Sequence, residues 1–316
     1  MFVYQNGSVY ELRPGIRRLT IPLPIAPGHV HCYVVDGDGG SLLVDTGLGL
    51  PELAELLRRE LTSPIERIMI THFHPDHVWG GEIARLVTGA PVFQGRLDYE
   101  QCERVWGSPD WPERIAAWFR GHGVPAEIAD EMIVQGRAAT PLIRFAHDPE
   151  PLAAGDAVCG WQVLELPGHA DGHLGFVRDG LLLAGDHLLP DVTPAVGLYP
   201  ESRPDPLGAY LASLERTIEL APRLAFPAHG EPIQDPSARA SELIEHHRER
   251  LERTAAALGS EPSTGYEVSL ALFPGELGSG QRRFAVAESL SHLERLVAEG
   301  AAKRFEDVVS VTYTAA

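Results

Sequence analysis

The sequence predicts an α/β fold in which short strands alternate with helices, followed by a smaller helical region. Three observations predict this class. Hydrophobic residues make up 44% of the 316 residues, which is enough for a buried core. Short apolar runs typical of strands recur through most of the chain, and stretches with helical periodicity separate several of them.

The N-terminal part predicts a meander of strands, followed by strand and helix in alternation. A helix is expected from Pro51 to about Leu61, because proline suits a first helical turn and leucines recur on one face. A strand at residues 65–70 then ends at Thr71, and a second helix starts near Gly81. The meander strands are expected at residues 9–12, 16–21, 31–35 and 41–45.

Residues 95–148 predict an irregular helical insertion, because helix-like stretches alternate with glycine and proline breaks. Its aromatic side chains could wall an apolar pocket or simply pack between helices; they are Trp106, Trp111, Trp118 and Phe119. After the insertion, a helix is expected at residues 207–220. Strands are expected at residues 161–166, 174–177, 181–184 and 224–227.

The pattern changes beyond Pro236, where helices replace strands and a hairpin closes the chain. Three helices with a terminal hairpin match a winged helix. We therefore predict a catalytic domain at residues 1–236 and a winged-helix-like domain at residues 237–316. The three helices are expected at residues 238–258, 264–272 and about 281–298.

Charge and composition limit the partners of the protein. The formal net charge of −18 disfavours nucleic acid, because a polyanion is repelled at long range. No apolar run approaches the roughly 20 residues that cross a bilayer. Residues 1–6 lack the basic and apolar segments of a signal peptide, and three scattered cysteines suit a reducing compartment. We expect a cytoplasmic protein without a membrane partner.

Four metal-competent side chains occur within one short run, His72-Phe73-His74-Pro75-Asp76-His77. The run follows a strand, and Pro75 keeps a helix from extending back into it. The two histidines that flank Phe73 can reach one ion, while Asp76 and His77 can reach a second ion nearby. Neutral imidazole and carboxylate suit zinc, iron or manganese.

Three further candidates stand after apolar strands, each flanked by glycine or proline: His169, Asp186 and His229. Sites on layered folds form where several strands end together. Chance clustering on a surface loop would explain a single histidine. It does not explain the full run together with three matching strand ends.

The order H-x-H-x-D-H followed by His, Asp and His resembles the metallo-β-lactamase superfamily, and within it the glyoxalase II-like branch. Residues 43–47 and 168–173 resemble the early strand–turn and the third-ligand turn of that family. The resemblance covers about residues 9–235 and implies a four-layer αββα metallo-β-lactamase sandwich. Residues 237–316 look like the winged-helix tail of a branch with endoribonuclease-like and polyketide thioesterase-like members.

The resemblance implies two ligand triads and a bridging carboxylate. The first triad consists of His72, His74 and His169. The second triad consists of Asp76, His77 and His229. Asp186 would bridge two divalent ions, for which zinc is preferred over iron or manganese. The spacing from His77 to His169 is longer than in compact members of the family, and the helical insertion accounts for it.

Two ions of this kind lower the pKa of a shared water and supply a bridging hydroxide. Asp76 and Asp186 are the predicted catalytic carboxylates, because Asp186 can orient that nucleophile and receive its proton. Asp45, Thr71 and His173 are expected to contact the ligands from behind. A plain turn cap explains Asp45 equally well, and structural packing is preferred for His173.

Three functions remain. The preferred one is hydrolysis of a small carbonyl substrate, with His31 and Tyr199 as candidate substrate contacts, although either side chain can simply pack. A phosphodiesterase or single-strand endoribonuclease needs a basic groove, yet residues 237–316 carry nine basic and twelve acidic residues. An iron-dependent oxidoreductase on the same scaffold ranks last, and a homodimer is left open.

Overall fold

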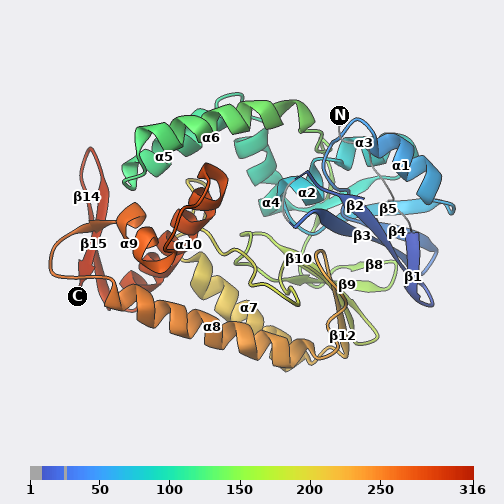
Figure 1. Cartoon of the computed structure of the whole chain (residues 1–316). Helices are drawn as coiled ribbons and strands as arrows, with labels where there is room; N and C mark the ends of the chain where they lie inside the picture. The colour runs from blue at the N-terminus through green and yellow to red at the C-terminus, as the bar shows by residue number, and fades with distance from the viewer. Residues whose placement is uncertain (1–8, 25–26) are drawn as a thin grey trace.

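The computed structural model describes residues 9–24 and 27–316. The prediction about a signal peptide concerns residues 1–6, which lie outside these ranges. Among the described residues, no helix is long and apolar enough to span a membrane. The described strands and helices follow an α/β order that ends in a helical region (Figure 1).

The first sheet keeps chain order and has seven strands within the described residues. They are β1 (Val9–Arg13), β2 (Ile16–Pro22), β3 (His29–Gly37), β4 (Gly40–Val44), β5 (Ile65–Ile70), β6 (Val92–Gly95) and β7 (Glu150–Leu152). β1 to β4 pair as an antiparallel meander, whereas β4 to β7 pair in parallel. The loops that follow β4, β5 and β6 therefore emerge at the same edge of the sheet.

The second sheet has five strands in the described chain, in the order β12-β11-β10-β9-β8. They are β8 (Ala157–Val158), β9 (Trp161–Glu165), β10 (Leu174–Arg178), β11 (Leu181–Gly185) and β12 (Leu224–Pro227). β11 and β12 pair in parallel, and the other pairs are antiparallel. The loops after β11 and β12 therefore leave at one edge.

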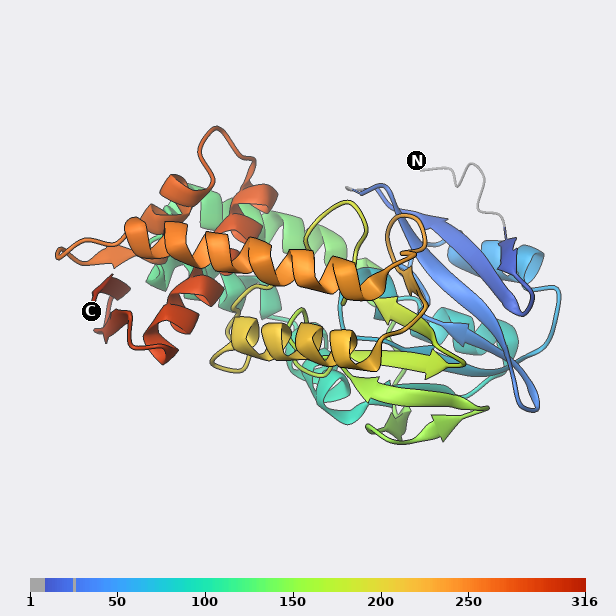
Figure 2. The same cartoon turned by 90° about the horizontal axis from the view of Figure 1, so that it is seen from below.

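Helices cover the outer faces of the two sheets, which share one buried core that includes Phe176. α1 (Leu53–Glu60) and α3 (Gly81–Thr88) pack on the first sheet. α7 (Pro206–Leu220) and α8 (Pro236–Ala256) run side by side over the second sheet (Figure 2). The layers therefore stack in the order helix, sheet, sheet, helix.

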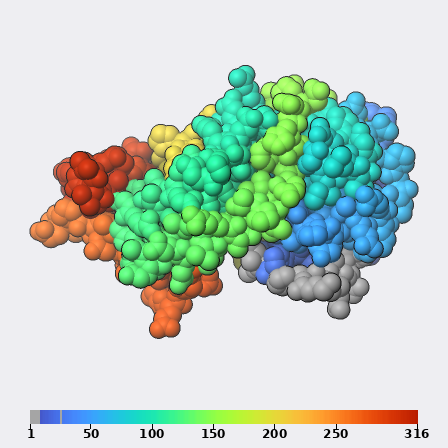
Figure 3. All heavy atoms as spheres, turned by 90° about the horizontal axis from the view of Figure 1, so that it is seen from above, coloured from blue at the N-terminus to red at the C-terminus, as the bar shows by residue number. Residues whose placement is uncertain are grey.

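The insertion is helical, as the glycine and proline breaks predict. α4 (Arg96–Gln101) continues directly into a π-helical segment, Cys102–Trp106. α5 (Trp111–Gly121) and α6 (Ala126–Ala139) pack against each other, and a 3₁₀ turn at Thr140–Leu142 closes the insertion. In the space-filling view, the green insertion extends from the sandwich to the C-terminal region (Figure 3).

The C-terminal region combines helices with a small sheet. Its further elements are β13 (Ser263–Thr264), α9 (Gly265–Leu272), α10 (Ser279–Ala298), β14 (Ala302–Glu306) and β15 (Val311–Ala315). The small sheet has the order β13-β15-β14. The capping box of Thr264 and Glu267 fixes the start of α9, since each side chain accepts a backbone N–H at the first turn.

The insertion and the C-terminal region bury apolar side chains against each other. Phe119 of α5 and Met132 of α6 belong to the same buried cluster as Leu290 of α10 and Tyr313 of β15. Half of the residues of α10 are buried, because α6, α7, α8 and α9 all pack against this helix. The two regions therefore share one apolar core, although Met132 and Leu290 are more than 150 residues apart in the sequence.

Candidate metal centre

The H-x-H-x-D-H run lies at the carboxyl end of β5, where the backbone changes from extended to helical. His74 is extended, with φ of −66° and ψ of 152°, and Pro75 opens the single helical turn α2 (Pro75–Val78). Proline fits this first turn because its nitrogen has no hydrogen to satisfy. The turn divides the run, with His72 and His74 before it and Asp76 and His77 within it.

The remaining candidates lie in loops of the second sheet. His169 lies between β9 and β10, Asp186 follows β11, and His229 follows β12. Three groups of side chains bring one ligand atom each to within 4.8 Å of one another. The first is His72, His74 and His169, which we call the histidine half. The second is Asp76, His77 and His229, which we call the carboxylate half. The third is His72, His77 and Asp186.

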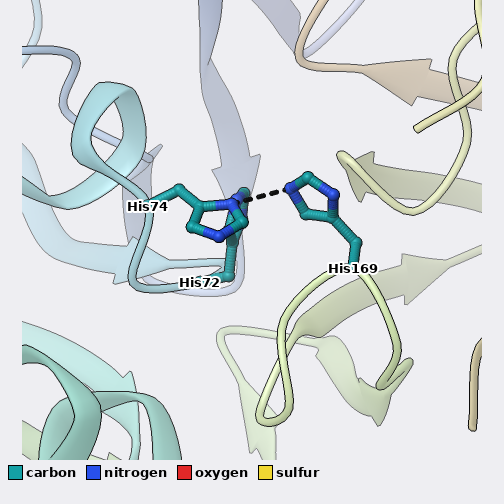
Figure 4. Close-up of side chains that lie close together, drawn as sticks. All are labelled: His72, His74 and His169. Carbon is teal, nitrogen blue, oxygen red and sulfur yellow. Dashed lines mark hydrogen bonds between the residues drawn. The ribbon is translucent and has the colours of Figure 1, made fainter. Parts of the chain in front are cut away.

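The histidine half brings together loops from both sheets (Figure 4). Nδ1 of His74 and Nε2 of His169 are 2.8 Å apart, and the two rings stand perpendicular, with an interplanar angle of 90°. His72 lies beside both, with ring centroids 4.7 Å from His74 and 4.9 Å from His169. Three imidazoles from two separate loops thus converge on one point.

Asp186 connects the two halves. One carboxylate oxygen lies 3.4 Å from Nε2 of His169 and 3.6 Å from Nε2 of His77. The other oxygen lies 3.5 Å from Nε2 of His229, which in turn is 3.3 Å from Asp76. One Asp186 oxygen thus lies near a histidine of each half and the other near His229, so this carboxylate contacts both halves, as a bridging ligand must.

Backbone carbonyl groups fix the orientation of two of the histidines. Nδ1 of His169 donates to the carbonyl of Ala195 at 2.7 Å, and Nδ1 of His229 donates to the carbonyl of His29 at 2.7 Å. In the neutral ring this leaves the Nε2 lone pair for the site. The two rings are therefore held in the tautomer that a metal ion requires.

Side chains fix the orientation of two further histidines: Asp45 contacts His77, and Thr71 contacts His72. Asp45 accepts from Nδ1 of His77 at 2.8 Å and from the Thr71 hydroxyl at 2.8 Å. The Thr71 oxygen lies 2.9 Å from Nδ1 of His72. Asp45 has a φ of 63°, a left-handed conformation that is uncommon for aspartate and turns its carboxylate toward this cluster.

Several buried atoms at the centre have no hydrogen-bond partner among the described residues: Nε2 of His72, Nε2 of His77 and Oδ1 of Asp186. Leaving a buried polar atom unpaired costs about 1–3 kcal/mol. A divalent cation would satisfy these atoms, because imidazole lone pairs and carboxylate oxygens are its ligands. The residues therefore fit a metal site.

Burial lowers the pKa values of the histidine half. For His72, burial is the main cause and the proximity of His77 adds to it, so its pKa lies well below the usual value. Burial likewise lowers the pKa of His74 and the pKa of His169. These imidazoles are therefore neutral near pH 7 and can bind an ion without first losing protons.

In the carboxylate half, by contrast, the pKa values of both histidines are raised. Burial would lower the pKa of His229, but Asp186 and Asp76 outweigh it and raise the pKa to about 10. At His77, burial also lowers the pKa. The carboxylates of Asp186, Asp76 and Asp45 outweigh burial, so the pKa lies well above its usual value. Without an ion, this half therefore keeps protons on its imidazoles at neutral pH.

The other sequence candidates lie in different settings. His173 stacks on His72 with centroids 4.8 Å apart, and its Nε2 accepts the backbone N–H of Asp186 at 3.2 Å. His31 is buried next to the Thr20 hydroxyl, with the side-chain oxygen 3.1 Å from its Nδ1. These contacts put His173 directly behind two candidate ligands. His31 belongs to none of the three ligand groups.

The Tyr199 ring lies edge-on to Phe119 of the insertion, with centroids 6.1 Å apart, and burial raises its pKa. The four insertion aromatics likewise have aromatic neighbours. Trp106 contacts Trp111, and Trp118 contacts Phe119. Trp106 stacks on Phe73 at 5.9 Å and donates its indole N–H to the Phe73 carbonyl at 2.8 Å. These contacts are those of packed side chains beside the site.

Three groups at the site are not predicted from the sequence: the carbonyl of Ala195, the carbonyl of His29 and the side chain of Asp98. The carbonyl of His29 orients His229, and Asp98 in α4 accepts backbone N–H groups from Phe73 at 3.0 Å and Gly172 at 2.8 Å. Burial raises the pKa of Asp98 to about 7 against these two hydrogen bonds. A lone aspartate within a helical insertion carries no local pattern that would reveal such a contact.

Comparison with known proteins gives two family matches. The family described as "Metallo-beta-lactamase superfamily" matches residues 25–229. The family described as "Metallo-beta-lactamase-like, C-terminal domain" matches residues 251–313. The first match includes every residue of the histidine half and of the carboxylate half.

Individual proteins are similar over most of the chain. The probable metallo-hydrolase YqjP of Bacillus subtilis (strain 168) is 30% identical over 306 residues, covering 90% of this chain and 92% of that protein. The crystal structure of a metallo-beta-lactamase family protein from Thermus thermophilus has a TM-score of 0.83 at 36% identity, covering 97% of this chain and all of that one. The atrochrysone carboxyl ACP thioesterase nsrC of Aspergillus novofumigatus (strain IBT 16806) is 25% identical, covering 87% of this chain and 75% of that protein.

Proposed function

The chain belongs to the metallo-beta-lactamase superfamily, and from this premise we propose that it is a binuclear metal-dependent hydrolase of small carbonyl compounds. One observation carries the proposal: buried, unpartnered atoms of His72, His77 and Asp186 converge between two triads of ligand atoms. Thioesters, esters and lactones are the substrates that we infer. Zinc is the preferred ion, with iron and manganese as alternatives, because the donors are nitrogen and oxygen.

When bound, two divalent ions would supply a water of lowered pKa and polarise the substrate carbonyl. Asp186 then orients the attacking water and accepts its proton, since its oxygens reach both halves. Asp76 holds His229 in line through the 3.3 Å contact. Asp45 and the Ala195 carbonyl keep the ligand imidazoles in the correct tautomer.

The carbonyl preference is supported by the surroundings of the histidine half. The Phe73 ring lies 4.8 Å from His74 and stacks on Trp106, so an apolar surface flanks this half of the site. A relative at 25% identity is named as an ACP thioesterase. An apolar wall beside a cationic centre suits an acyl group with a polarisable carbonyl.

A nuclease has less support. In a nucleic-acid-binding winged helix, the recognition helix must reach a groove. Here α10, which corresponds in chain order, has half of its residues buried against neighbouring helices. Residues 237–316 also carry nine basic and twelve acidic residues, which opposes binding to phosphate. An iron-dependent oxidoreductase ranks third.

We propose the glyoxalase II-like branch, a catalytic domain at residues 1–236 and a winged-helix-like domain at residues 237–316. The last is supported by the element order α8, β13, α9, α10, β14, β15 and by the sheet order β13-β15-β14. A cytoplasmic location and a small-molecule substrate remain predictions, and a homodimer remains open.

The test combines metal analysis with a substrate panel. Purified protein should contain about two divalent ions per chain and should hydrolyse at least one thioester, ester or lactone. Asp186→Ala should abolish that turnover, because it removes the group that connects the halves. Asp191→Ala is the matched control, since it removes an exposed carboxylate from the same loop and should leave turnover unchanged.

Two results would contradict the proposal. The first is full activity in protein from which all metal has been removed. The second is an unchanged rate in Asp186→Ala. Cleavage of phosphodiesters with a steep salt dependence, and no cleavage of carbonyl substrates, would favour the nuclease instead.

A further inference from the structure

Asp98 is a buried carboxylate at the start of the insertion that contacts both metal-ligand loops. Its side chain is 1% exposed. Oδ2 accepts the backbone N–H of Phe73 at 3.0 Å, and Oδ1 accepts the backbone N–H of Gly172 at 2.8 Å. Each carboxylate oxygen therefore accepts a hydrogen bond from one loop, and both hydrogen bonds are stronger when the group is ionised.

The two loops carry the three residues of the histidine half. Phe73 lies between His72 and His74 at the end of β5, and Gly172 follows His169 in the turn between β9 and β10. The loops belong to different sheets, and one backbone hydrogen bond joins their strand ends directly, from the Leu174 N–H to the Thr71 carbonyl at 2.7 Å. Asp98 thus bridges two segments that must keep a fixed separation if the histidines are to share an ion.

Asp98 and Gly172 are packed so closely that no side chain fits between them. A Cβ added to Gly172 would lie 2.6 Å from Oδ1 of Asp98 and 2.9 Å from its backbone nitrogen. Three residues further along α4, the Gln101 side chain donates to Asp171 at 2.9 Å. This is a second hydrogen-bond contact between α4 and the His169 loop. The α4 surface and the His169 loop are therefore fitted to one another.

The cost of this arrangement indicates that it serves more than packing. Among the described residues no arginine, lysine or histidine forms an ion pair with Asp98. Burying a carboxylate without a cationic partner is unfavourable, and two backbone N–H groups return only part of the loss. A neutral side chain at this position would avoid the free-energy cost of burying a charge, but it would not accept a hydrogen bond from each loop with two carboxylate oxygens.

We propose that Asp98 is a positioning residue that sets the separation of the His72–His74 segment and the His169 loop, and thereby the affinity of the histidine half for its metal ion. The inference rests on the proposed metal site. It assigns to the insertion a role in building the centre, in addition to whatever it contributes to the substrate pocket.

The main variant is Asp98→Asn, which keeps the size of the side chain. An amide offers one oxygen and one NH₂ group, so one of the two loop N–H groups would face a donor and lose its partner. The partners that orient metal ligands typically contribute 10- to 100-fold to metal affinity. We expect the affinity for the first zinc ion, measured by competition with a chromophoric chelator, to fall by about 10- to 100-fold.

Asp156→Asn is the matched control. Asp156 also accepts a backbone N–H, from Ala153 at 2.8 Å, but it lies in an exposed turn away from the ligand loops. Its zinc affinity should match that of the unmodified protein. Cobalt(II) substitution adds a second readout, since a displaced His169 alters the visible absorption of the bound ion in Asp98→Asn but not in Asp156→Asn.

Gly172→Ala tests the same contact from the other side and keeps the proposal testable if Asp98→Asn fails to fold. The added methyl group would push the loop away while the carboxylate stays intact. Its zinc affinity should fall in the same range. Activity lost at low zinc should return partly at saturating zinc in both variants, which a purely structural defect would not produce.

The outcomes separate this inference from the function on which it rests. If the unmodified protein binds no divalent ion, the proposed function fails first. If it binds zinc and both variants bind zinc with unchanged affinity, or lose only thermal stability, then Asp98 merely packs and the inference is overturned.

Discussion

The histidine half and the carboxylate half of the candidate metal centre lie side by side but hold protons very differently. Burial keeps the pKa of His72 well below its usual value. Burial acts on His229 too, but two neighbouring carboxylates outweigh it and raise the pKa to about 10. Both rings are buried, so the difference between their pKa values comes from the two carboxylates beside His229. The comparison indicates that one half is ready for an ion, whereas the other must exchange protons for it.

Within a single half, the largest expected effect comes from removing the carboxylate of Asp76. Asp76→Ala should reduce the metal content from about two ions to one, because only the histidine half keeps its ligand set. A second ion contributes several kcal/mol to transition-state stabilisation, so turnover should fall by at least about 100-fold. Elemental analysis and steady-state rates measure the two effects. Two tightly bound ions in Asp76→Ala would contradict the division into halves.

The next effect is a difference in pH dependence between the halves. The raised pKa of His229 means that this ring is protonated in metal-free protein throughout pH 6–8. A metal ion must displace this proton and the one on His77, so the affinity of the carboxylate half should fall by about a hundredfold for each unit that the pH is lowered. The histidine half should change little over the same window, because the lowered pKa of His72 leaves its ring already neutral.

Calorimetric titration of metal-free protein, in buffers of different ionisation enthalpy, counts the protons released with each ion. One ion should release at least one proton more than the other. Equal proton release at both steps would show that the two halves titrate alike.

A smaller effect is expected at Asp45, which contacts His77 directly and His72 through Thr71. Asp45→Asn suits the left-handed backbone, since asparagine tolerates a positive φ. It weakens the hydrogen bond to His77, so the affinity of the carboxylate half should fall by about 10- to 100-fold. The histidine half should lose less, because it is reached only through the hydroxyl.

Asp235→Asn is the control for this variant. Asp235 caps α8 by accepting from the backbone N–H of Ala238, and it belongs to none of the three ligand groups although it follows His229 by six residues. Its substitution should cost at most about 1 kcal/mol of stability and leave metal binding intact. An Asp45→Asn protein with normal metal affinity would reduce Asp45 to a turn cap.

Much of the centre could be predicted because its residues leave a local signal. His72 to His77 form one dense run, and His169, Asp186 and His229 each follow an apolar strand beside glycine or proline. Asp98, the carbonyl of His29 and the carbonyl of Ala195 leave none. A backbone carbonyl has no residue type to recognise, and the role of Asp98 depends on a long-range contact that only the folded chain creates.

The fold divides in a similar way. The mixed α/β class is confirmed, and the strand at Ile65–Ile70 is where the sequence predicts it. The predictions miss β6, β7, β8 and β13, which have two to four residues each. A strand of that length shows too little alternation to be distinguished from a loop, and it forms because a neighbouring strand offers hydrogen bonds. The turn α2 is missed for the same reason.

The apolar core shared by α5, α6 and the C-terminal helices limits how this chain can be recombined with its relatives. Phe119 and Met132 depend on Leu290 and Tyr313 for burial, so a tail grafted from another protein would meet an insertion shaped for a different partner. A chimera should succeed only when both segments are exchanged together. The two segments have to be inherited and engineered as one unit, although the sequence writes them far apart.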